Sequence, residues 1–266
     1  MPDDKNKKIV FLFARQRSGT GALSSLLNQH PACNYLGEVF GDAIEQHPMH
    51  YFNWLRDVVT SEPDLILPDR SEMRLQRYLG HLRESLTEQV LILDVKLSQA
   101  HQFEPYDRGV NARPNLFSMV KASGYGVLFV RRRNLVRTYL SRLSADKSGI
   151  WHATGSVQGL AKLQVDTNHM VNSLKKMARR ERYIDNLAAL FPDACELEYA
   201  ELFDSSTNSL TSKAAQALEV ALGIDSLGEL RTMQQKLRPG SLEDIVENCA
   251  EVRLALAGTQ FEEMAH

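Results

Sequence analysis

The chain has the length and composition of an ordinary globular protein. Its 266 residues are 43% hydrophobic and 24% charged, which excludes a largely disordered chain and a membrane-embedded one. The 31 Lys and Arg residues nearly balance the 33 Asp and Glu residues, so no overall basic field favours a nucleic-acid partner. Any bound anion must therefore be held by a local group of cations.

Cysteine usage and the N-terminus indicate the compartment. An odd number of cysteines, far apart in sequence, argues against a disulfide framework and a zinc site; they are Cys33, Cys195 and Cys249. The apolar run at residues 9–14 is too short for a signal peptide or a membrane span. We expect one cytoplasmic domain over residues 1–266, with no membrane span and with residues 1–7 as a disordered tail.

Short apolar runs alternate with helical patterns along the chain, as in parallel α/β folds. Strands are predicted at residues 9–14, 34–36, 89–96, 126–130 and 195–199. Helices are predicted at residues 20–29, 115–122, 134–148, 212–222 and 242–257, with a long helical stretch within residues 157–190 and a helical cap within residues 48–88. The fold class predicted is α/β, with a central, mostly parallel sheet of four or five strands flanked by helices.

The first chemical motif is the turn between the first predicted strand and helix, Arg15-Gln16-Arg17-Ser18-Gly19-Thr20-Gly21. Backbone N–H groups at such a helix start form a cradle for phosphate or sulfate. Gly19 and Gly21 allow close approach of the ligand, and the Ser18 and Thr20 hydroxyls add donors. Alternatively, Ser18 or Thr20 serves only as a helix cap. The chain contains neither the G-x-x-x-x-G-K-[ST] string of nucleotide triphosphatases nor G-x-G-x-x-G.

The second motif begins where the predicted strand at residues 126–130 ends. Arg131, Arg132 and Arg133 come first, and Ser141 lies about two helical turns further on. Guanidinium groups at a strand end, together with a serine hydroxyl, suit a second phosphate. The alternative is that some of these arginines form only a solvated basic surface.

The two motifs, RQRSGTGAL and VRRRNLVRTYLSRLSA, resemble the 5′-phosphosulfate loop and the 3′-phosphate motif of PAPS-dependent sulfotransferases, PAPS being 3′-phosphoadenosine 5′-phosphosulfate. Further similar stretches are LGEVF, LDVKLSQ, ELEYAELF and KLRPGSLEDIVEN. The likeness is greatest to the bacterial type that includes trehalose 2-sulfotransferase and nodulation-factor sulfotransferases. It implies a P-loop-like fold and favours a homodimer.

The resemblance also assigns cofactor-binding residues. Arg17 would contact the transferred group and the bridging oxygen. The 5′-phosphate would be held by Ser18, Gly19 and Thr20, within a cofactor-binding turn made of Arg15, Gln16, Arg17, Ser18, Gly19, Thr20 and Gly21. For the 3′-phosphate, Arg133 lies eight residues before Ser141, as in animal cytosolic enzymes, and Arg132 lies nine before it, as in the bacterial trehalose enzyme. Arg238 would belong to a loop that closes over the nucleotide.

The expected general base departs from the animal enzymes, which place a histidine two residues after a strand-end lysine. Here Lys96 is followed by Leu97 and Ser98. In the bacterial type a glutamate of a Gly-Glu pair takes this role, which assigns Glu38 as the base. Alternatively, Glu38 only favours the start of a helix over residues 39–46, or His101 is the base. Together with Arg17, Lys96 would stabilise charge on the transferred group.

The acceptor is expected to be a hydroxyl of a small molecule, carbohydrate or lipid-linked. Its candidate contacts are Lys96, His101, Trp151 and His152. No metal is expected, because the sequence has no His/Cys ligand cluster and no triphosphate-type magnesium site. Two alternatives stay open, namely a P-loop-like kinase or nucleotide triphosphatase with a degenerate loop, and a non-catalytic module that binds PAPS or another bis-anion.

Overall fold

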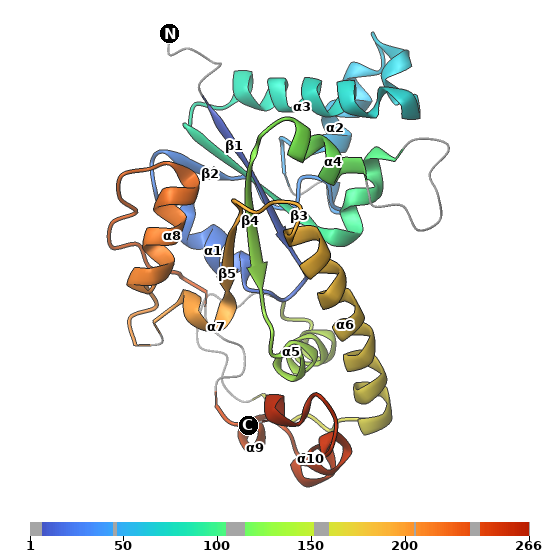
Figure 1. Ribbon diagram of the computed structural model, residues 1–266, viewed down its shortest axis with the longest axis vertical. Helices are drawn as coiled ribbons and strands as arrows, with labels where there is room; N and C mark the ends of the chain where they lie inside the picture. The colour runs from blue at the N-terminus through green and yellow to red at the C-terminus, as the bar shows by residue number, and fades with distance from the viewer. Residues whose placement is uncertain are drawn as a thin grey trace.

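The computed structural model describes residues 7–44, 47–104, 115–151, 160–204, 206–234 and 240–265. Five strands form one sheet in the order β2-β3-β1-β4-β5, and every neighbouring pair is parallel (Figure 1). The strands are β1 (Lys8–Ala14), β2 (Cys33–Tyr35), β3 (Val90–Lys96), β4 (Gly126–Arg131) and β5 (Cys195–Glu198). The α/β fold class and the strand count predicted from the sequence are therefore confirmed.

Helices cover both faces of the sheet, as continuous apolar strands require. Alternate residues of β1 enter two separate cores, with Phe11 and Phe13 on one face and Val10 and Leu12 on the other. The Val10 face packs against α1 (Thr20–Leu27) and α8 (Ser212–Leu222). The Phe11 face packs against α3 (Ser71–Ser85), α4 (Asn115–Ala122) and the C-terminal part of α6 (Thr167–Ala188).

Two further groups of helices extend this framework. The region predicted as a helical cap contains α2 (Tyr51–Val58), η3 (Pro63–Ile66), η4 (Pro68–Arg70) and α3. A third core joins α5 (Leu135–Ser148) and α6 to α9 (Leu242–Ile245) and α10 (Cys249–Leu256), which lie below the sheet in Figure 1. The short helices η5 (Leu97–Phe103), α7 (Tyr199–Leu202) and η6 (Glu262–Ala265) complete the described elements.

Two helix predictions were wrong in detail. Residues 39–42 form a turn in which the Gly41 N–H donates to the Glu38 carbonyl, and not the helix considered over residues 39–46, of which 45–46 lie outside the described residues. The single helix predicted over residues 242–257 is two helices, because Val246 is extended and bridges Leu163. In both places tertiary contacts override local helical periodicity.

Two further observations concern the N-terminal residues and the apolarity of the helices. Residues 1–6 of the expected tail lie outside the described residues, whereas the Lys7 ammonium donates to the carbonyl of Leu86 at 2.5 Å. Within the described residues, no helix has the length and apolarity needed to cross a membrane.

Candidate functional site

The sequence motifs meet at the carboxyl edge of the sheet. The turn at residues 15–19 follows β1, and Arg132 follows β4, its neighbour in the sheet. Lys96 ends β3 on the other side of β1, and Glu38 lies beyond β2. Because all five strands run parallel, their carboxyl ends lie together, which is where open α/β sheets bind ligands.

The turn itself has the backbone geometry of an anion cradle. Arg17 and Gly19 both have positive φ, at 67° and 89°. Gly19 is the N-cap of α1, and no side chain caps the first turn of this helix. The helix-cap alternative for Ser18 and Thr20 is therefore wrong, and the N-terminal N–H groups of α1 remain available to a ligand.

The buried Ser18 hydroxyl is a second feature of the turn that suits an anion. The residue is 1% exposed, and its hydroxyl has no hydrogen-bond partner within the described part of the chain. A buried hydroxyl without a partner costs free energy, which an acceptor seated on the turn would recover.

Arg17 and Arg132 bring the two sequence motifs together. Nε and Nη2 of Arg17 donate to the Ser141 hydroxyl at 3.1 and 2.9 Å, and Nη1 donates to the Trp151 carbonyl at 2.7 Å. Nη1 of Arg132 donates to the Arg17 carbonyl at 3.3 Å. The Arg132 guanidinium also lies over the Tyr199 ring, 4.7 Å from its centroid.

These two guanidinium groups are not neutralised. No carboxylate among the described residues lies within 4 Å of Arg17 or Arg132. Burial lowers the pKa of both groups, and for Arg132 the nearby Arg17 lowers it further. Two desolvated cations close to an uncapped helix start favour an anionic ligand.

Arg15 and Arg131 are neutralised by carboxylates on α6. Arg15 Nε lies 2.6 Å from Glu181 Oε1 and Arg131 Nη2 lies 3.0 Å from Glu181 Oε2, so one carboxylate bridges both. Asp185 lies 2.7 Å from Arg131, which is itself 4% exposed. Although burial alone would lower the pKa of Arg131, its hydrogen bonds with Asp185 and Glu181 raise it. These two arginines join α6 to the sheet edge.

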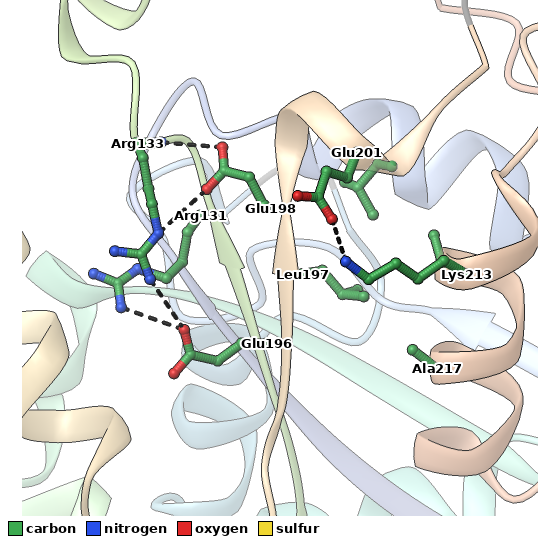
Figure 2. Close-up of a pocket in the computed structure, with 10 residues that line it drawn as sticks. Arg131, Arg133, Glu196, Leu197, Glu198, Glu201, Lys213 and Ala217 are labelled. Atoms are coloured by element: carbon green, nitrogen blue, oxygen red, sulfur yellow. Dashed lines mark hydrogen bonds and ion pairs between the residues drawn. The ribbon is translucent and has the colours of Figure 1, made fainter.

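Arg133 lies in a different place from Arg132. It lies 3.6 Å from both Glu196 and Glu198, at a pocket of about 220 Å³ between β5 and α8. Figure 2 shows Arg131 and Arg133 with these two glutamates on one side of β5, and the Lys213–Glu201 ion pair on the other. Acidic and basic side chains balance in this pocket, so it has no preference for a phosphate. Of the two candidates for the 3′-phosphate, Arg132 is the one that lies against the turn.

A further cluster of polar side chains lies on the other side of the turn, around Lys96. The Lys96 ammonium lies 2.6 Å from both carboxylate oxygens of Asp94 and donates to the Thr20 hydroxyl at 2.8 Å. It also lies 3.5 Å from Glu38 Oε1. The other Glu38 oxygen accepts from Gln99 Nε2 at 2.8 Å, and the side chain is 44% exposed. Glu38 thus presents an accessible carboxylate close to the turn.

Of the other residues predicted for the site, some lie at the turn and others do not. Trp151 is 46% exposed and lies beside Arg17, with the guanidinium 5.8 Å from the ring centroid. His101 lies in η5, where its Nδ1 lies 3.6 Å from Glu104 Oε1. Gln16 is exposed, and Gly21 lies in the first turn of α1. His152 and Arg238 lie outside the described residues.

No family model matches this chain, and no curated protein matches it significantly. Function is therefore inferred from the motifs and from the geometry of the sheet edge. Among the described residues, no three His, Cys, Asp or Glu side chains are grouped in a way that could hold a metal ion.

Three residues of the site were not predicted from the sequence. Tyr199 stands on the turn, because a Cβ added to Gly19 would lie only 2.2 Å from its ring. Asp94 and Tyr35 complete the group around Lys96. For Asp94 there was a signal, since an acidic residue within an apolar strand and two positions before Lys96 shares a strand face with that lysine.

Proposed function

We propose that this chain is a sulfotransferase that transfers a sulfuryl group from PAPS to a hydroxyl of a small carbohydrate or lipid-linked acceptor. The observation that carries the proposal is the contact between Arg17 and Ser141, which joins two motifs 124 residues apart. A turn that held a single anion would need no second motif. A bisphosphorylated nucleotide needs two anion sites that face one another.

The residues present suit such a ligand. The partnerless Ser18 hydroxyl and the free N-terminal N–H groups of α1 would hold the 5′-phosphosulfate, with Arg17 beside it. Arg132 and Ser141 would hold the 3′-phosphate. PAPS supplies the sulfuryl group and, in adenosine 3′,5′-bisphosphate, a stable leaving group. We assign the 3′-phosphate to Arg132 and not to Arg133, because Arg133 forms ion pairs with two glutamates.

The proposed reaction requires two things of the protein, namely positive charge at the sulfuryl group and a general base for the acceptor hydroxyl. The acceptor oxygen forms a bond to sulfur as the bond from sulfur to the 5′-phosphate oxygen breaks, and adenosine 3′,5′-bisphosphate leaves. Glu38 takes the proton of the acceptor hydroxyl, for which its exposed carboxylate is suited. Arg17 stabilises the negative charge on the non-bridging sulfuryl oxygens.

Nucleotide binding is the first test of this proposal. Adenosine 3′,5′-bisphosphate titrated calorimetrically into the wild-type protein should bind with a Kd of about 1–10 μM, without added magnesium. ATP with magnesium serves as the comparator for a degenerate kinase or nucleotide triphosphatase. No heat of binding for the bisphosphate, or tighter magnesium-dependent binding of ATP with turnover, would reject the proposal.

Glu38→Gln separates the base from the binding residues. The variant should bind adenosine 3′,5′-bisphosphate as the wild type does, because the amide keeps the shape of the side chain and Glu38 does not contact the turn. Transfer of labelled sulfate from PAPS to a panel of sugar and lipid-linked hydroxyls should fall about 100-fold or more. Full transfer by the variant would show that another group is the base, and no transfer by the wild type would favour a non-catalytic binding module.

A further inference from the structure

A buried ion pair lies directly beneath the anion-binding turn. Asp94 and Lys96 are each 3% exposed and lie on the same face of β3. The ammonium contacts both Asp94 oxygens at 2.6 Å and the Thr20 hydroxyl, at the first position of α1, at 2.8 Å. The pair thus connects the end of β3 to the start of the helix that carries the cradle.

The three contacts account for the donors of this ammonium. An ammonium group has three N–H bonds, and here Asp94 and Thr20 accept them. The Asp94 carboxylate also neutralises its charge. Lys96 therefore differs from Arg17 and Arg132, which have no carboxylate nearby among the described residues. Besides Asp94, the ammonium contacts Thr20 at the turn and, at the longer distance of 3.5 Å, Glu38.

Stability alone does not account for the pair. A buried ion pair is often no more stabilising than apolar side chains of similar volume. Tyr35 contributes a further polar contact, because its hydroxyl donates to Asp94 Oδ2 at 2.9 Å. Burial first, and then the Asp94 charge, raise the pKa of Tyr35, so its hydroxyl stays protonated and remains a donor. Three polar side chains from β2 and β3, namely Asp94, Lys96 and Tyr35, thus form one hydrogen-bonded group that contacts the Thr20 hydroxyl.

We propose that Asp94 is a positioning residue that, through Lys96, orients the Thr20 hydroxyl to donate its proton to an anion seated on the turn. Because Thr20 Oγ1 accepts from Lys96, its own proton is free to be donated. An anion seated on the turn would be the acceptor of this proton. Lys96 would then act on the anion indirectly, as would Asp94. This inference rests on the proposed function.

The test is a double-mutant cycle on binding. Thr20→Val removes the hydroxyl but keeps the shape, and should weaken binding of adenosine 3′,5′-bisphosphate about tenfold. Asp94→Asn in the wild-type background should weaken it by a similar factor, about tenfold. In the Thr20→Val background, Asp94→Asn should change the Kd less than about twofold, since the group that it orients is gone. Thr20→Ser, which keeps the hydroxyl, should retain the effect of Asp94→Asn.

Equal losses from Asp94→Asn in both backgrounds would overturn the inference, because a merely structural role does not depend on the Thr20 hydroxyl. Thermal unfolding of each variant verifies folding. If Asp94→Asn does not fold, Tyr35→Phe, which removes one contact to Asp94 without changing charge, replaces it in the cycle with the same criterion. The cycle is also run with inorganic sulfate. Wild-type binding of sulfate but not of the bisphosphate would reject the proposed function and still test the inference, and binding of neither would reject both.

Discussion

Gly19 occupies a position that allows no side chain. Its φ of 89° is one that residues with a Cβ rarely adopt, and an added Cβ would lie 2.2 Å from the Tyr199 ring. Tyr199 in turn supports the Arg132 guanidinium from below. The absence of a side chain at Gly19 therefore sets both the course of the turn and the place of one of its cations.

Gly19→Ala should accordingly damage both stability and binding. The strained φ and the displaced Tyr199 should lower the free energy of unfolding by about 2 kcal/mol, as measured by urea denaturation. Binding of adenosine 3′,5′-bisphosphate should weaken in parallel, because Arg132 loses the ring beneath it. Adding Tyr199→Ala should relieve the clash but not the backbone strain. A Gly19→Ala variant with wild-type stability and affinity would contradict this description of the turn.

Three consecutive arginines illustrate what the sequence could not decide. The strand end was predicted correctly, but the partner of each side chain depends on segments far away in the chain. Arg131 pairs with acidic residues of α6, Arg132 contacts the turn, and Arg133 pairs with acidic residues of β5. Successive residues near a strand end point in different directions, so an error of one residue in register exchanges these roles.

At the scale of elements, the prediction was most accurate where apolar periodicity is strong. The strands and α8 lie close to their predicted positions, because buried runs leave few alternatives. The alternative considered for Glu38, a helix after it, was wrong, because Val39 and Phe40 are fully buried where the chain turns. The prediction could not foresee the break at Val246 either, since the bridge to Leu163 is a tertiary contact. Tertiary packing overrode propensity at both places.

The histidine at the start of α2 should make the stability of the protein depend on pH. His50 is the N-cap, its Nδ1 accepts from the Phe52 N–H, and the residue is 1% exposed. Burial lowers the pKa of His50 below its ordinary value of 6.5. The unfolded chain therefore binds a proton at His50 more readily than the folded one does. The stabilisation that neutral, buried His50 provides is present above about pH 6.5 and is lost as the pH falls.

His50→Asn should reduce this dependence, because asparagine is a good N-cap that does not titrate. The variant loses packing at neutral pH, so the useful quantity is the difference in free energy of unfolding between variant and wild type. From about pH 7.5 to about pH 5 this difference should change in favour of the variant. A constant difference across this range, in urea denaturation, would show that His50 does not take up a proton on unfolding.

At the scale of the whole molecule, the sheet order explains why distant motifs form one site. With β1 between β3 and β4, the turn after β1 lies between Lys96 on one side and Arg132 on the other. The sequence predicted parallel strands and hence a common edge, but it did not give the strand order. Nor did it predict that Asp94 neutralises Lys96 or that Glu181 neutralises Arg15, because each is a matter of side-chain partners.

In the proposed function, one site binds two phosphates of one nucleotide, and Arg132 binds the second. The most direct test compares adenosine 3′,5′-bisphosphate with adenosine 5′-monophosphate, which lacks the 3′-phosphate, by calorimetry. The wild type should prefer the bisphosphate about 10- to 100-fold, as charge-assisted hydrogen bonds imply. Arg132→Ala should abolish most of this preference, whereas Arg133→Ala, the matched control one residue away, should keep it. An unchanged preference in Arg132→Ala, or its loss in Arg133→Ala alone, would contradict the account.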